Sequence, residues 1–255
     1  RIHSVNPESV LIGEVWENAA DKIAYGKRRS YFRGAQLDSV MNYPTRKALL
    51  DFAEFGDGEA LAAALTDLYS SYPRCVSASL MNLIGTHDTE RVLTILGNPH
   101  KVRENSYAYN SVQEKLRLTD EERERGVKLL KLISALQFTL FGFPCVYYGD
   151  EAGMEGMSDP FCRYPFPWHK IDGEINEHYK KLGALRRGEG IFAGGEFKIT
   201  CADGGYFEFI RYKKEEKYFV KVAVNMGEPR RVDAAGGVNL YTGKRIVGNP
   251  MLKKG

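Results

Sequence analysis

The chain has 255 residues, of which 43% are hydrophobic and 27% charged, and its formal net charge at pH 7 is +3. This composition provides enough apolar surface for a packed core and excludes a disordered chain. The 26 glycines and 10 prolines are scattered along the sequence, which excludes a collagen-like or low-complexity chain. Basic runs are short and mixed with acidic residues, so we expect no nucleic-acid partner. No apolar run approaches the roughly 18 residues that span a membrane, so we expect no membrane partner.

A length of roughly 250 residues is typical of one complete eight-stranded α/β barrel, but it also fits two smaller domains. The sequence begins at Arg1 without a Met or a signal peptide, and we expect a processed or truncated piece of a cytoplasmic protein.

The four cysteines form no C-x-x-C motif, which argues against a zinc knuckle and favours free thiols in a reducing compartment. Cys75 and Cys145 lie in apolar, strand-like runs and are expected to be buried.

The first 190 residues alternate short apolar runs with helical patterns, which is typical of βα units. The apolar runs predict parallel strands at residues 10–12, 39–41, 79–84 and 143–148. The helical patterns predict helices at residues 44–54, 59–72, 120–140 and 175–187. The third of these helices is the most strongly marked, because Thr119 and Glu122 have the spacing of a capping box.

The pattern changes after Gly188. Residues 197–199, 206–212 and 218–224 are rich in β-branched and aromatic side chains, and short turns without a helix separate them. We therefore expect two domains, an α/β domain at residues 1–188 and a small antiparallel β-sandwich at residues 189–255.

Polar side chains follow each of the four predicted parallel strands. They are Glu14 and Glu17, Asn42 and Tyr43, His87 and Asp88, and Asp150 and Glu151. In parallel α/β architectures, catalytic groups gather at the carboxyl ends of the strands. A Glu and an Asp that face one pocket suit glycoside cleavage, in which one carboxylic acid protonates the leaving oxygen and another carboxylate stabilises or attacks the cation-like sugar.

Structural roles are the alternative for the same residues. Glu14 and Asp88 have the position of helix N-caps, and His87 that of a structural hydrogen-bond donor. Asp150 and Glu151 are interpreted as residues that hold a loop. Phosphate, dinucleotide and zincin motifs do not occur in the sequence, and we expect no metal site.

These segments together resemble the alpha-amylase family of glycoside hydrolases (family 13), in its cyclomaltodextrinase and neopullulanase branch. Leu-Ile-Gly-Glu-Val-Trp at 11–16 is similar to the fifth-strand motif, and the segments at 82–91 and 144–151 resemble those of the seventh and eighth strands. Residues 38–44 fit the sixth strand. The motifs stand in the family's order and cover nearly the whole chain, so the resemblance implies strands five to eight of a (β/α)8 barrel, followed by a β domain.

The resemblance also implies roles for individual residues. Glu14 would be the general acid/base, Asp88 the carboxylate that holds ring hydroxyls and stabilises the transition state, and His87 a hydroxyl donor beside it. Trp16 would border the leaving-group side.

A D-x-x-x-R element completes the resemblance. In it, Asp159 and Arg163 would contact glucose on the non-reducing side of the cut. Family members often have a second Arg where this chain has Tyr164.

One departure from the family pattern affects the chemistry directly. The family's nucleophile is an Asp in an R-x-D motif on the fourth strand, and no such motif occurs in the 13 residues before Glu14. A retaining mechanism requires this nucleophile. We therefore expect a fragment of a retaining α-glucan hydrolase that is inactive alone. The parent enzyme would cleave α-1,4 links, with α-1,6 links as a further option, in maltodextrins, cyclodextrins, starch or pullulan.

Two other functions remain open at this point. The chain would be a non-catalytic carbohydrate-binding or scaffold half-barrel, or a transglycosylase with the same residues. Because unpaired strand edges are normally covered, pairing with the missing barrel half or with a second copy is expected. The resemblance implies no cofactor, and a structural calcium ion in the parent enzyme has no support in these residues.

Overall fold

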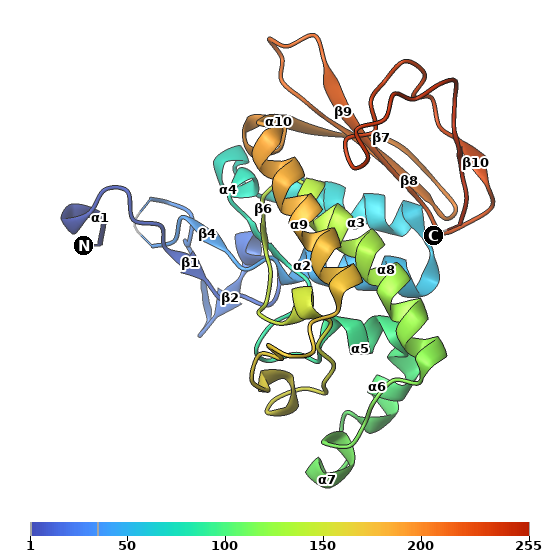
Figure 1. Ribbon diagram of the computed structural model, residues 1–255. Coiled ribbons are helices and arrows are strands. Elements are labelled where there is room, and N and C mark those ends of the chain that lie inside the picture. Colours follow the sequence, from blue (N-terminus) through green and yellow to red (C-terminus); the bar gives the residue numbers. More distant parts are fainter. Residues whose placement is uncertain (1, 35, 255) are drawn as a thin grey trace.

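The structure is a computed structural model that describes residues 2–34 and 36–254, and the expectations for Arg1 lie outside the described residues (Figure 1). Four short parallel strands follow one another along the N-terminal part: β1 (Ile12–Gly13), β4 (Ser39–Val40), β5 (Met81–Leu83) and β6 (Phe143–Cys145). β1 pairs with β4 and β5 pairs with β6, and a parallel bridge between Met41 and Met81 joins the two pairs. The strands lie where the apolar runs predicted them, but they are shorter.

Four long helices confirm the helical predictions. They are α2 (Tyr43–Phe55), α3 (Gly58–Ser71), α8 (Asp120–Thr139) and α9 (Gly173–Gly188). The predicted capping box opens α8, since the Thr119 hydroxyl accepts a hydrogen bond from Glu122 N (3.3 Å) and the Glu122 carboxylate accepts one from Thr119 N (2.8 Å).

Several short elements were not predicted. They are α4 (Arg74–Ala78), α5 (Val92–Gly97), α6 (Pro99–Asn105), α7 (Asn110–Gln113), α10 (Ile191–Gly194), the hairpin of β2 (Ile23–Ala24) and β3 (Lys27–Arg28), and 3-10 turns at Ala19–Asp21, Asp150–Ala152 and Phe161–Arg163. The further short helix α1 (Ile2–Val5) lies where the sequence indicates the end of a helix before the first strand. α5 is too short to show a helical period and depends on close packing against α8. A Cβ at Gly126 would lie 3.0 Å from both a side-chain and a backbone atom of Leu93. The prediction that Cys75 is buried in a strand is wrong: it lies exposed in α4, which begins directly after Pro73.

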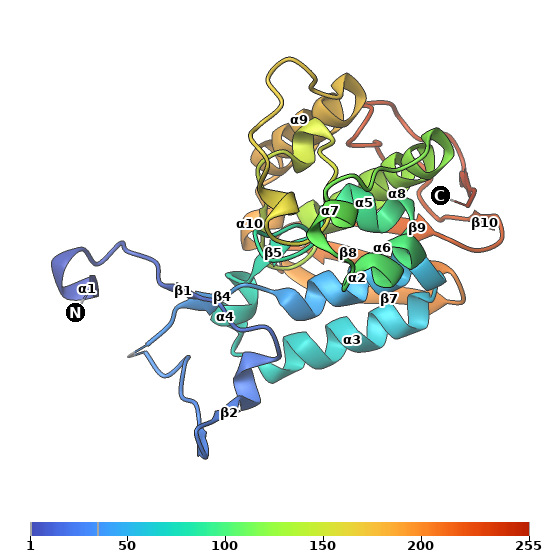
Figure 2. The ribbon, with the colours of Figure 1, turned by 90° about the horizontal axis from the view of Figure 1, so that it is seen from below.

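The C-terminal part confirms the three predicted antiparallel strands. β7 (Glu196–Asp203), β8 (Tyr206–Tyr212) and β9 (Phe219–Asn225) form one sheet, and β10 (Arg230–Arg231) pairs with β11 (Met251–Leu252). Phe207 and Phe209 of β8 are fully buried in the same hydrophobic core as Leu49 and Leu65 of α2 and α3. The sheet therefore packs directly on these helices. By contrast, α1 and the β2–β3 hairpin project away from the helical body (Figure 2).

Arg211 of β8 connects this sheet to the end of α8. Its guanidinium is fully buried and donates only to backbone carbonyls. The acceptors are Thr139 and Leu140 (2.9 Å each), Gly195 (3.0 Å), Phe192 and Glu196 (3.1 Å each) and Ile191 (3.4 Å). One side chain thus satisfies carbonyls at the end of α8 and in the stretch from α10 to the start of β7.

His178 of α9 lies buried between α8 and the C-terminal loop. One ring nitrogen lies 2.9 Å from the Ser134 hydroxyl and the other 2.9 Å from the Tyr241 hydroxyl. Burial, reinforced by the charge of nearby Lys131, lowers the pKa of His178 to about 4.

Among the described residues, no helix is long and apolar enough to cross a membrane.

We expect the folded chain to lose stability as the pH falls from about 6.5 to about 4 because of His178. The unfolded chain binds a proton on this imidazole below its ordinary pKa of about 6.5, whereas the folded chain keeps it neutral until about pH 4. The effect is about 2–3 kcal/mol. Urea unfolding across this pH range should show a smaller pH dependence for His178→Gln than for the parent chain. The exposed His100→Gln is the matched control, and parallel profiles for the parent and His178→Gln would contradict the expectation.

Candidate active site

Three predicted site residues come together at the carboxyl ends of β1 and β5. Glu14 follows β1, and His87 and Asp88 follow β5. All three side chains are exposed, and their potential ligand atoms lie within 4.8 Å of one another. Parallel strand pairing achieves this, because it brings the polar ends of strands that are distant in sequence to the same edge.

Glu14 is held by an aromatic pair. Tyr43, the first residue of α2, donates a hydrogen bond from its hydroxyl to Glu14 Oε1 (2.9 Å). Its ring stacks on Trp16 with the centroids 4.1 Å apart and the planes at 15°. Asn42 caps α2 by accepting a hydrogen bond from Thr45 N (3.2 Å), which fixes where Tyr43 begins the helix. Burial and the contact with Glu14 raise the pKa of Tyr43 to about 12, so its hydroxyl remains a donor.

Tyr43 was predicted only as one of the polar groups at the strand ends, without a role. The available signal was an aromatic residue with a hydroxyl between a strand and Pro44. That signal could not show that the hydroxyl reaches Glu14, because the contact depends on how α2 lies beside β1.

In the segment after β5, the backbone of Gly85 lies close against the side chain of Asp150. A Cβ at Gly85 would lie 2.1 Å from Asp150 Oδ2, so only glycine fits at this position without a shift of its neighbours. Asp88 N donates to the Thr86 hydroxyl (3.1 Å), which turns the chain so that His87 Nε2 lies 3.3 Å from Asp88 Oδ2.

The loop after β6 returns to this pair through Arg163. The guanidinium donates to Asp88 Oδ1 (2.9 Å) and to the His87 carbonyl (2.9 Å), and it lies 2.8 Å from Asp159 Oδ1. The Cys162 thiol donates to the same carbonyl (3.1 Å). The structure thus brings the predicted residues Asp159 and Arg163 to the side of the site that holds Asp88.

A buried ion pair lies beneath these loops. Arg91 and Asp150 are both buried, with Nη1 3.2 Å from Oδ1, and the guanidinium lies over the rings of Tyr147 and Tyr148 at 4.4 and 4.8 Å from their centroids. Arg91 also donates to the Tyr148 carbonyl. Burial raises the pKa of Asp150 while the charge of Arg91 opposes the rise. The pair links the ends of β5 and β6.

The interpretation of Asp150 and Glu151 as loop-holding residues is confirmed. Asp150 pairs with Arg91, and the Glu151 carboxylate accepts a hydrogen bond from Gly149 N (2.8 Å) within its own turn. The N-cap interpretation of Glu14 and Asp88 is wrong. The helical turn after β1 is capped by Asn18, and Arg91 occupies the N-cap position of α5 without a capping hydrogen bond from its side chain.

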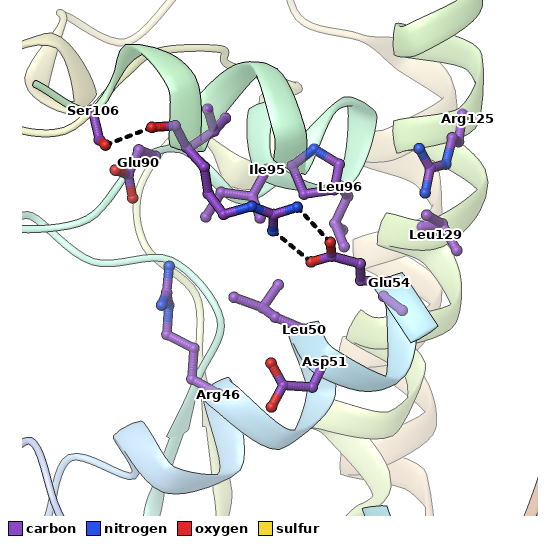
Figure 3. A pocket seen from close by; sticks show the side chains of 14 residues that line it. Arg46, Leu50, Asp51, Glu54, Glu90, Ile95, Leu96, Ser106, Arg125 and Leu129 are labelled. Carbon is purple, nitrogen blue, oxygen red and sulfur yellow. Dashed lines mark hydrogen bonds and ion pairs between the residues drawn. The ribbon is translucent and has the colours of Figure 1, made fainter. Parts of the chain in front are cut away.

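A separate hollow of about 210 Å³ lies between α2, α5, α6 and α8 (Figure 3). Arg46 and Asp51 reach it from α2, and a bidentate pair of Arg103 and Glu54 (2.7 and 2.8 Å) borders it. None of the predicted site residues lines it. Arg46 links it to the site, because it donates to the carbonyl of Ile84 (3.0 Å), the residue that precedes Gly85.

The arrangement at the strand ends offers two carboxylates, an imidazole and a guanidinium on one open surface. Such a set can donate a proton to an oxygen and hold several hydroxyl groups. Within the described part of the chain, Glu14, His87 and Asp88 form one group whose donor atoms are close enough together to hold a metal ion.

Comparisons with known proteins identify a matching family model and several similar chains. A family model described as the alpha amylase catalytic domain matches residues 1–117. The chain is 32% identical to a cyclomaltodextrinase from Geobacillus thermopakistaniensis over 96% of its own length, and 30% identical to neopullulanase 2 from Thermoactinomyces vulgaris over 97%. The type III pullulan hydrolase from Thermococcus kodakarensis superimposes with a TM-score of 0.76 at 28% identity, over 99% of this chain and 40% of that chain. The chain spans 37% and 38% of the lengths of the first two relatives.

Proposed function

Because the chain belongs to the alpha-amylase family of glycoside hydrolases, we propose that it is the acid/base-bearing part of a retaining α-glucan hydrolase. In this proposal β1, β4, β5 and β6 are strands five to eight of the barrel, residues 1–188 are barrel, and residues 189–255 are a β-sandwich domain. The observation that carries the proposal is the approach of Glu14, His87 and Asp88 to within 4.8 Å at the carboxyl ends of β1 and β5.

Each residue of the site then has a chemical task. Glu14 protonates the leaving oxygen and later removes a proton from water, while the Tyr43 hydroxyl holds its carboxyl group in place (2.9 Å). Asp88 and His87 bind ring hydroxyls, and Asp88 stabilises the positive charge of the transition state. Arg163 orients Asp88 and, together with Asp159, contacts the sugar. Trp16, 51% exposed and stacked on Tyr43, borders the leaving-group side.

The nucleophile is the missing part of the mechanism. Glu8 is the sole carboxylate before Glu14, and it is not part of an R-x-D motif. We place the nucleophile in an upstream barrel half, in accordance with the 37% share of the cyclomaltodextrinase that this chain spans. Among the described strands, β1 pairs only with β4 and β6 pairs only with β5. The free edges of β1 and β6 are therefore available to such a half or to a second copy.

The proposed substrates are α-glucans with α-1,4 links, and α-1,6 links as a further option. The names of the relatives support this, since they refer to cyclomaltodextrins and pullulan. The four cysteines are free thiols, which supports a reducing compartment such as the cytoplasm as part of the proposal.

The isolated chain is expected to be inactive on maltotriose and cyclodextrins, because it cannot form the glycosyl-enzyme intermediate. Its rate of hydrolysis should lie roughly 10³–10⁶-fold below the rate of an enzyme completed with an upstream half. Chromatography of the released sugars measures this. Turnover by the isolated chain at the level of the completed enzyme would refute the proposal. Binding without cleavage by the completed protein would favour a carbohydrate-binding half-barrel, and products longer than the substrate would identify a transglycosylase.

A further inference from the structure

The carboxylates of Glu14 and Asp88 each have one oxygen that is already held from outside the cluster. Tyr43 donates to Glu14 Oε1 (2.9 Å) and Arg163 donates to Asp88 Oδ1 (2.9 Å). The second oxygen of each carboxylate is thereby oriented by a fixed neighbour. Metal sites in proteins are built this way, with outer partners that fix the direction of the inner ligands.

His87 supplies a nitrogen ligand at a distance that suits a small ion. Its Nε2 lies 3.3 Å from Asp88 Oδ2. Two ligands that each lie about 2.0–2.1 Å from a tetrahedral zinc ion are about 3.3–3.4 Å apart, so this edge of a tetrahedron is already formed. Glu14 lies within 4.8 Å of both partners and is exposed, so a change of its side-chain torsions can bring its oxygen to the third corner.

We propose that Glu14, His87 and Asp88 form a binding site for a divalent transition-metal ion of the zinc or cobalt type. Glu14, whose partner Tyr43 is neutral, and Asp88, whose charge Arg163 offsets in part, attract the ion. The imidazole favours these metals over calcium and magnesium, which require more oxygen ligands. The exposure of all three residues leaves a fourth position for water. The site stands on these contacts alone and does not require that the chain cleaves glucans. In the completed enzyme the ion would occupy both carboxylates and inhibit the reaction, a consequence that does rest on the proposed function.

Zinc chloride titrated into the full chain by calorimetry, in a Cys75→Ser background that removes the exposed thiol, tests the site. We expect one zinc ion per chain, and a visible absorption band typical of four-coordinate cobalt when cobalt chloride replaces zinc. His87→Ala and Glu14→Gln should each lower the zinc affinity at least about 10–100-fold, and the outer-partner variant Tyr43→Phe about 10-fold. Calcium and magnesium chlorides should give no comparable heat.

His100→Ala is the matched control. His100 Nδ1 lies 3.3 Å from Glu104 Oε2, which reproduces the distance between His87 and Asp88, but among the described residues this pair belongs to no group of three potential ligands. This variant should bind zinc like the parent chain. The proposal is overturned if the parent chain binds no zinc, if His87→Ala binds zinc as tightly as the parent, or if His100→Ala weakens binding as much as His87→Ala. Circular dichroism of each variant establishes that it is folded, as expected for substitutions of exposed side chains.

Discussion

Replacing Glu14 with Gln is expected to lower kcat/KM of the completed enzyme about 10²–10⁴-fold on maltotriose. The amide keeps the size of the side chain and can still contact the Tyr43 hydroxyl, which lies 2.9 Å from Glu14 Oε1. It cannot donate a proton to the leaving oxygen or remove one from water. The measurement is steady-state hydrolysis of maltotriose by the parent enzyme and the variant at equal concentrations.

The nature of the leaving group separates acid catalysis from a loss of fold. An aryl maltoside releases a phenolate that needs little protonation, so Glu14→Gln should slow glycosyl transfer from this substrate much less than from maltotriose. Glu17→Gln is the matched control, because Glu17 pairs with Lys22 and lies outside the cluster. Full activity of Glu14→Gln on maltotriose, or an equal loss on both substrates, would show that Glu14 is not the acid/base.

The juxtaposition of Glu14 with His87 and Asp88 was predictable because it depends on few assumptions. Parallel strands have a fixed polarity, so residues that directly follow different strands lie at one edge whatever the details of packing. Arg163 was predicted as a site residue on another basis, the resemblance of the D-x-x-x-R element to that of the family. Its contacts with Asp88 and the His87 carbonyl are a property of the folded loop.

Other features depend on packing that leaves no local pattern. Arg91 follows a cluster of polar residues in the sequence and looks like a surface residue, yet it is 1% exposed and paired with Asp150. α5 has six residues, fewer than two helical turns, so no period can be counted in it. Its helical state follows from burial of Val92, Leu93 and Leu96 against the core. Likewise, the alternation of residues in β8 predicted a strand, but a fully buried Arg211 within it could not be foreseen.

Replacing Arg211 with Met is expected to lower the free energy of unfolding by about 3–5 kcal/mol. Methionine fills much of the same volume, but it donates no hydrogen bond to carbonyls that Arg211 now satisfies at the end of α8 and around α10. A buried charge also opposes folding, and burial lowers the pKa of Arg211 to about 10. The group therefore remains charged at pH 7. With six backbone acceptors around one guanidinium, we expect the loss of hydrogen bonds to exceed the gain from removing the charge.

Urea unfolding at pH 7, followed by circular dichroism, measures the effect. Arg211→Lys should lose part of the stability, because a lysine keeps the charge but lacks the planar set of five donors. Arg231→Met is the matched control, since Arg231 is exposed on β10 and its replacement should change the free energy of unfolding by less than about 0.5 kcal/mol. If Arg211→Met unfolds within about 1 kcal/mol of the parent chain, the carbonyls find other donors. The position of β8 in the core would then depend on Phe207 and Phe209 rather than on the guanidinium.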